Sequence, residues 1–86
     1  MAEAPDRERY VMPVLVKEVF DAFPPGSGMV IQVETPDGKK EERNRHFKPL
    51  MDELQKTSGL TVDKWVGTQW EYDFFDHHLV KMLKGK

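Results

Sequence analysis

The stretch from His46 to Phe74 constrains the fold of this chain most, because its hydrophobic period changes once, at Gly59. Before Gly59, apolar residues recur at the spacing of one helical stripe: Phe47, Leu50, Met51 and Leu54. Proline is tolerated in the first turn of a helix, so Pro49 predicts a helix that begins between residues 45 and 47 and ends at the glycine. After the glycine, alternation predicts a strand over 69–75 with one aromatic side: Trp70, Tyr72 and Phe74.

The composition limits the protein to one small domain. With 86 residues, 38% of them hydrophobic and no cysteine, the chain has material for a single core and none for a disulfide framework. The first eight residues lack apolar periodicity, so we expect a disordered tail over 1–8 and one domain over 9–86. The sequence has no apolar run long enough to span a bilayer and no signal-peptide pattern, which favours a cytoplasmic protein that makes no membrane contact.

Residues 10–23 allow two interpretations. Their β-branched side chains favour a strand, with either burial on both faces or a bulge near Lys17. The alternative is a helix that begins at Pro13.

The next segment predicts a hairpin. Residues 29–34 alternate as a half-buried strand, and Thr35–Gly38 is typical of a type I turn. A returning strand from Lys39 would have no apolar side chain over residues 39–45, so we expect it at a sheet edge.

The C-terminal third predicts two strands and a helix. A short strand over 60–66 should bend at Gly67 into the 69–75 strand. In the first strand, Trp65 is either a cover over the helix or a partly exposed contact residue. Asp76 has the character of an N-cap, and the residues that follow predict a short C-terminal helix, with a stripe of Leu79, Met82 and Leu83.

The expected order is therefore three strands, a helix, two strands and a short helix. A helix between strands 3 and 4 of a five-stranded Greek-key barrel is the arrangement of the OB-fold, so we predict a mainly β, OB-like barrel with helices. If residues 10–23 are helical, the alternative is an α+β fold with helices packed on an antiparallel sheet.

The segment Leu-Thr-Val-Asp-Lys-Trp-Val-Gly, which follows the central helix, resembles small OB-fold proteins of phages and prophages. That group includes single-stranded-DNA-binding-like proteins. The resemblance covers roughly residues 29–74 and depends on four positions: Gly59, Asp63, Trp65 and Gly67. It implies an OB-fold that binds nucleic acid, although the family usually has Lys at the position of Thr68 and apolar residues in its third strand.

The charge pattern predicts a local site for a polyanion. The formal net charge is −2, but residues 39–48 contain five Lys or Arg against two Glu. A single-strand interface needs cations for phosphates and flat side chains for bases. The predicted cations are Lys39, Lys40, Arg43, Arg45 and Lys48, and the predicted platforms are Phe23, His46, Trp70 and Tyr72. Burial in the core is the alternative for the last two, and solvated surface charge is the alternative for the cations.

The sequence also allows two other functional classes. Glu71, Asp73, Asp76 and two histidines offer metal-ligand chemistry, but His77 and His78 on a helix would point about 100° apart. We therefore expect no metal, no cofactor and no enzymatic activity. A protein-interaction or dimerisation module, such as a phage protein that docks on a host protein, would use an apolar patch: Phe20, Phe23, Met29 and the 79–83 stripe. The leading hypothesis is non-enzymatic binding of single-stranded nucleic acid with low sequence specificity.

Overall fold

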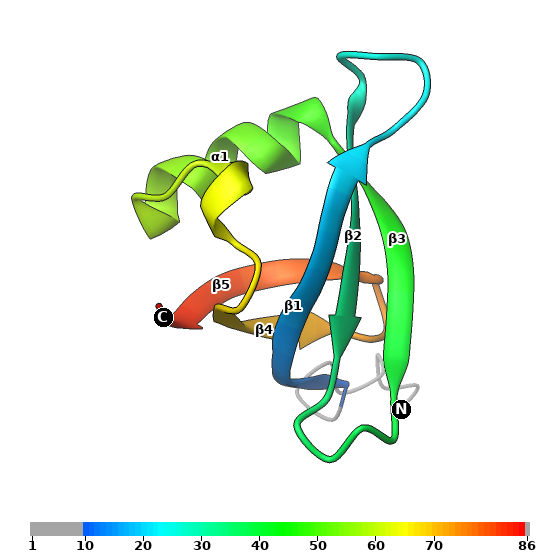
Figure 1. The fold of residues 1–86 in the computed structure, drawn as a ribbon, viewed down its shortest axis with the longest axis vertical. Coiled ribbons are helices and arrows are strands. Elements are labelled where there is room, and N and C mark those ends of the chain that lie inside the picture. Colours follow the sequence, from blue (N-terminus) through cyan, green and yellow to red (C-terminus); the bar gives the residue numbers. More distant parts are fainter. Residues whose placement is uncertain (1–9, 86) are drawn as a thin grey trace, which may run out of the picture.

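The structure, a computed structural model, describes residues 10–85 as one antiparallel sheet of five strands with one α-helix (Figure 1). The expected tail over 1–8 lies outside the described residues. The elements in chain order are β1 (Val11–Asp21), β2 (Gly28–Glu34), β3 (Glu41–Phe47), α1 (Lys48–Ser58), the 3-10 turn η2 (Val62–Lys64), β4 (Gln69–Asp73) and β5 (His78–Lys84). The strand order is β3-β2-β1-β4-β5, so β3 and β5 are the edges of a sheet that does not close.

The N-terminal half follows the sequence prediction. Residues 10–23 form a strand and not a helix. The register between β1 and β2 shifts at a bulge, which was one of the two options for this strand, because Val16 pairs with Val33 and Glu18 with Gln32. β3 is an edge strand, as its charged sequence predicted.

In the part of the chain that the structure describes, no helix has the length and apolar character needed to cross a membrane.

The core lies between the inner face of the sheet and α1. Figure 1 shows α1 after the upper end of β3 and the β4–β5 hairpin at a steep angle to β1–β3, so the sheet wraps around this core. Met51 and Leu54 are the buried residues of α1, and Gly59 ends the helix in the left-handed conformation, as expected. The indole rings of Trp65 and Trp70 pack with centroids 4.6 Å apart. Trp65 is therefore a core residue, which settles the choice left open by the sequence.

The predicted C-terminal helix is wrong, because residues 78–84 form β5 against β4. Tyr72 pairs with Leu79 and Glu71 with Lys81, so Val80 is an extra residue in a bulge. The bulge places the inward residues Leu79 and Met82 three positions apart, which imitates helical spacing. Asp76 does not cap a helix; instead Asp73 accepts hydrogen bonds from the N–H groups of Phe75 and Asp76 in the β4–β5 turn.

The predicted strand over 60–66 is also wrong. This segment contains η2, and the Trp65 indole Nε1 donates to the Leu60 carbonyl oxygen at 3.0 Å. This hydrogen bond joins the two ends of the segment. Leu60 and Val62 pack against the core, to which Trp65 belongs, and the segment does not pair as a strand. The structure still has five strands, as predicted, because β5 is present where a helix was expected and the predicted strand over 60–66 is absent.

The start of α1 differs from the prediction in one consequential way. The helix begins at Lys48, and Phe47 is its N-cap with an extended backbone. Phe47 therefore does not belong to the apolar stripe of α1, and 59% of its surface is exposed.

Gly28, the first residue of β2, is required because its backbone passes close to the backbone of β3. Its φ is +151°, and a Cβ atom there would lie 2.1 Å from the carbonyl oxygen of His46. Because the opposing atoms are backbone, they cannot rotate away. We expect Gly28→Ala to lower the free energy of unfolding by about 2 kcal/mol or more in urea denaturation. Gly38→Ala is the matched control, since Gly38 also has a positive φ but open space around it. Equal losses in both variants would show that the close approach costs nothing.

Candidate nucleic-acid interface

The outer face of β1, β2 and β3 carries a cluster of rings and guanidinium groups. We call it the Phe/Arg face and define it by Phe20, Phe23, Phe47, Arg43 and Arg45. The alternation of β3 places Arg43, Arg45 and Phe47 outward and Glu42, Asn44 and His46 inward. Phe20 on β1 and Arg45 on β3 flank Val30 in one cross-strand row. The face thus combines residues from β1, from β3 and from the β1–β2 loop, and β2 lies between the two strands.

The bulge in β1 brings Phe20 to this face. Without it, Phe20 would share the parity of the buried Val14 and Val16 and would point into the core. The shift at Lys17 reverses that parity, so Val19 pairs with the buried Ile31, while Phe20 pairs with Val30 and is 38% exposed.

Each arginine of the face lies against a phenyl ring. The guanidinium Cζ of Arg43 is 5.4 Å from the ring centroid of Phe20, and that of Arg45 is 5.8 Å from the ring centroid of Phe47. Arg43 Nη2 donates to Gln32 Oε1 at 2.7 Å, and Arg45 Nη2 donates to the Phe23 carbonyl oxygen at 2.9 Å. These contacts orient both side chains without neutralising them. Within residues 10–85, neither arginine forms an ion pair with a carboxylate.

The three rings of the face are unusually open to solvent for phenylalanine. Phe23, in the β1–β2 loop, is 81% exposed, which exceeds the exposure of Phe20 and Phe47. An exposed phenyl ring has no polar atom to hydrate, so a group of three beside two cations marks a binding surface better than scattered apolar residues do.

The predicted cations separate into two groups. Arg43, Arg45 and the platform Phe23 come together on the face. Lys48 is adjacent, at the start of α1, and its Nζ lies 3.3 Å from Asp52 Oδ2. Lys39 and Lys40 precede β3 at the opposite end of the strand, and Lys40 Nζ lies 5.3 Å from the ring centroid of Phe74.

Three predicted platforms are not available to a base. His46, Trp70 and Tyr72 each have an exposed fraction of 0%, so they must be removed from the predicted contact set. They belong to the core side of the sheet, because β3 and β4 alternate and these positions point inward. The indole of Trp70 also has a partner, since its Nε1 donates to Thr68 Oγ1 at 2.7 Å.

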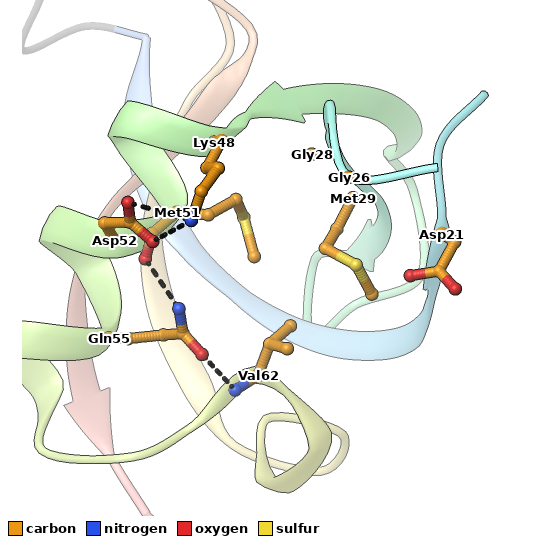
Figure 2. Close-up of a pocket in the computed structure, with 9 residues that line it drawn as sticks. All are labelled: Asp21, Gly26, Gly28, Met29, Lys48, Met51, Asp52, Gln55 and Val62. Atoms are coloured by element: carbon orange, nitrogen blue, oxygen red, sulfur yellow. Dashed lines mark hydrogen bonds and ion pairs between the residues drawn. The ribbon is translucent and has the colours of Figure 1, made fainter. Parts of the chain in front are cut away.

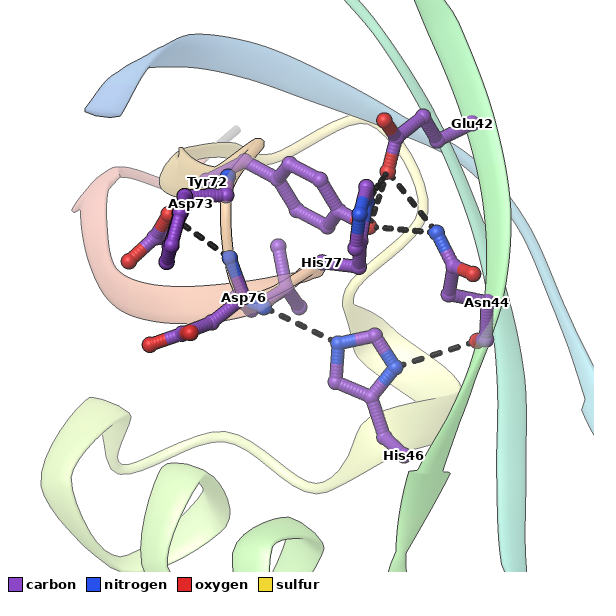
Figure 3. A network of polar contacts seen from close by, with 9 residues as sticks. Glu42, Asn44, His46, Tyr72, Asp73, Asp76 and His77 are labelled. Carbon is purple, nitrogen blue, oxygen red and sulfur yellow. Dashed lines mark hydrogen bonds and ion pairs between the residues drawn. The ribbon is translucent and has the colours of Figure 1, made fainter. Parts of the chain in front are cut away.

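On the inner side, a polar network joins the two edges of the sheet and fixes the position of β3 (Figure 3). Glu42 Oε1 accepts from the Tyr72 hydroxyl at 2.8 Å and from Asn44 Nδ2 at 2.8 Å, and it lies 2.9 Å from His77 Nδ1. Burial, reinforced by Glu42, raises the pKa of the Tyr72 phenol far above its ordinary value, so the hydroxyl remains a donor.

His46 makes the direct bridge from β3 to β5. Its Nε2 accepts from the Leu79 N–H at 2.9 Å, which requires the proton on Nδ1, and Nδ1 then donates to the Asn44 carbonyl oxygen at 3.1 Å. Burial lowers the pKa of His46 to about 4, while its hydrogen bond to Asn44 opposes the shift. The imidazole is therefore neutral at physiological pH and serves as a structural acceptor.

A separate hollow of about 220 Å³ lies between the start of α1 and the β1–β2 loop (Figure 2). Its apolar lining comes from Met29, Met51 and Val62. The polar side chains of α1 at its border are already bonded, because Gln55 contacts the Met51 carbonyl and the Val62 N–H, and Lys48 contacts Asp52. The lining of the hollow contains no aromatic residue, unlike the Phe/Arg face.

Two residues of the face, Phe20 and Phe47, were not among the predicted platforms. A bulge near Lys17 was one of two options for this strand, and its effect on the alternation of side chains would have placed Phe20 outward. No comparable signal existed for Phe47, since a helix that began between residues 45 and 47, as predicted, would bury it. The acidic and histidine residues near the β4–β5 turn do not form a metal centre: among residues 10–85, no group of three His, Asp or Glu residues is arranged to hold an ion.

The fold and the site together define a class: a small antiparallel β domain with one helix and an exposed aromatic and arginine surface. Comparison with protein-family models, curated proteins and solved structures gives no match to this chain.

Proposed function

We propose that this protein binds single-stranded nucleic acid through the Phe/Arg face, with little sequence preference and without catalysing a reaction. One observation carries the proposal: three exposed phenyl rings share a surface with two guanidinium groups that have no carboxylate partner within residues 10–85. Bases stack on aromatic rings, and arginine binds phosphate through paired N–H donors.

The chemistry of the face supports low sequence preference. A phenyl ring has no hydrogen-bonding group with which to distinguish one base edge from another, and every base has a face that can stack. The arginines would contact phosphates, which carry no sequence information. Only unpaired bases are free to stack on a protein ring, so a single strand is preferred over a duplex.

We also propose that the architecture is OB-like. The supporting features are the position of α1 between β3 and β4 and the pairing of β1 with both β2 and β4. The side-chain bridge from His46 to β5 joins the two edges that a closed barrel would pair through backbone hydrogen bonds. OB-folds bind oligonucleotides on the face of strands 2 and 3, and the Phe/Arg face lies across β2 and takes three of its five residues from β3.

The first test is binding of fluorescein-labelled oligo(dT) of ten nucleotides, measured by anisotropy in 50 mM salt. We expect saturable binding whose affinity falls with salt with a log–log slope of about −1.4, because each of two phosphates contributes about 0.7. Combined replacement of Phe20 and Phe47 by Ala should weaken binding by about 30-fold, if each lost platform contributes about 1 kcal/mol. Absence of binding at high micromolar protein would overturn the proposal.

A protein partner is the second candidate, and one observation favours it. Glu18 shares the cross-strand row of Gln32 and Arg43, so the face also presents a carboxylate. Mixed charge around exposed phenylalanine is common at protein interfaces, and a second copy of the chain could supply the complementary surface. Self-association detected by analytical ultracentrifugation, abolished by Phe20→Ala and accompanied by no oligonucleotide binding, would favour this candidate.

A further inference from the structure

We infer that the Phe/Arg face accepts a short stretch of about two to three nucleotides aligned with β3, and that Glu34 and Glu41 determine where this stretch ends. The inference rests on the proposed function and specifies the length of the ligand and its alignment along β3. It follows from the order of outward residues along β3 and from the charges of the rows that cross the sheet.

The outward residues of β3 form a linear series. They are Glu41, Arg43, Arg45 and Phe47, each two positions from the next. Alternate residues of a strand are about 7 Å apart, which is close to the length of one nucleotide in an extended single strand. Arg43 and Arg45 can therefore meet consecutive phosphates, while the rings of Phe20 and Phe47 lie beside the two guanidinium groups.

At the Glu41 end of the series, the surface of the sheet is negatively charged. Glu41 is directly opposite Glu34 in the β2–β3 register, and carboxylates opposed in this way destabilise a sheet. Lys17 relieves part of the repulsion, because its Nζ lies 3.9 Å from Glu34 Oε2, but the three side chains together still carry one net negative charge. A phosphate that continued past Arg43 would meet two carboxylates, so the backbone of a bound strand should turn away from the sheet there.

The neighbouring positions do not provide another route. Toward β1, the row of Arg43 leads through Gln32 to Glu18, so crossing the sheet in that direction also brings phosphate to a carboxylate. Lys40 precedes Glu41 in the chain, but its ammonium lies over the ring of Phe74, a residue of the core cluster. The favourable surface is thus confined to the end of β3 nearest α1 and the β1–β2 loop.

The test is a length series of oligo(dT) with two, three, four, six and ten nucleotides, each used to displace a labelled ten-nucleotide strand. Affinity should rise up to about three nucleotides and then increase only by the number of available registers, which is less than tenfold. In Glu34→Gln/Glu41→Gln, the six-nucleotide strand should bind at least threefold more tightly than to the wild-type protein, while the three-nucleotide strand should be unchanged. Glu53→Gln/Glu71→Gln is the control with the same change in net charge away from the face.

The possible results separate the two proposals. Binding that strengthens steadily from four to ten nucleotides would overturn the length limit and leave the proposed function intact. Equal gains for the three- and six-nucleotide strands in Glu34→Gln/Glu41→Gln, or equal gains in the control variant, would overturn the role of the acidic pair. Failure of every length to bind would overturn the proposed function itself. Circular dichroism of each variant verifies that the fold is retained.

Discussion

Arg43→Glu combined with Arg45→Glu should lower the affinity for oligo(dT) by about 100-fold or more, because two charge-assisted contacts worth about 1.5 kcal/mol each are replaced by repulsion. The fold should be retained, since both side chains lie on the outer face and neither contributes to the core. Anisotropy titration of the ten-nucleotide strand in 50 mM salt measures the effect. The salt dependence that remains should be close to zero, because the phosphate contacts are gone.

Lys39→Glu combined with Lys40→Glu is the matched control for this prediction. It changes the net charge by the same amount, but it acts at the opposite end of β3, beyond the acidic row of Glu41. If the site is local, this control should weaken binding by no more than about threefold through long-range attraction alone. An equal loss in both double variants would show that binding depends on overall charge and not on the Phe/Arg face.

His46→Ala should lower the free energy of unfolding by about 4 kcal/mol. The substitution leaves a cavity in a fully buried position and removes the acceptor of the buried Leu79 N–H, and each loss is worth about 2 kcal/mol. His46→Gln is the control, because an amide oxygen can accept the same N–H, and it should lose less than half as much. Urea denaturation at pH 7.5 compares the three proteins, and equal losses in the two variants would argue against the bridge.

The same residue should make the stability of the wild-type protein depend on pH. His46 has a pKa of about 4 in the folded protein and an ordinary value of about 6.5 when unfolded. Between these values the unfolded chain binds a proton that the folded protein does not, so stability falls as the pH falls. The contribution is complete above pH 6.5, and about 3 kcal/mol of it is lost by pH 4. His46→Gln lacks this term, so its stability should change less over the same range, and identical pH profiles would refute the assignment.

Local sequence patterns predicted most of the secondary structure before β4. The β-branched residues of β1, the turn before β3 and the helix limited by Pro49 and Gly59 each lie within one contiguous segment. Their conformations depend mainly on neighbours in the chain, and periodicity and turn chemistry record those preferences directly. The alternation of β4 was predictable for the same reason, but the side that faces the core was not: Trp70 and Tyr72 were predicted as contact residues and are buried.

The errors occurred where pairing with a distant strand overrides local spacing. The bulge at Val80 forms only because β5 pairs with β4. It places the inward residues of β5 three positions apart, which is also the spacing of one face of a helix. The segment before Gly67 alternates like a strand but has no strand partner in the sheet. Periodicity alone cannot distinguish these cases, since both depend on residues far away in the sequence.

The sequence by itself determined that this chain forms a small β-rich domain with one capped helix and that its cations concentrate around β3. Only the tertiary structure decided which side chains solvent can reach. The bulge in β1 turns Phe20 outward, the late start of α1 exposes Phe47, and the bridge to β5 buries His46 between two exposed neighbours. The physical reason is that conformation is set largely by local interactions, whereas exposure is a property of the assembled sheet, so the Phe/Arg face exists only after the strands have paired.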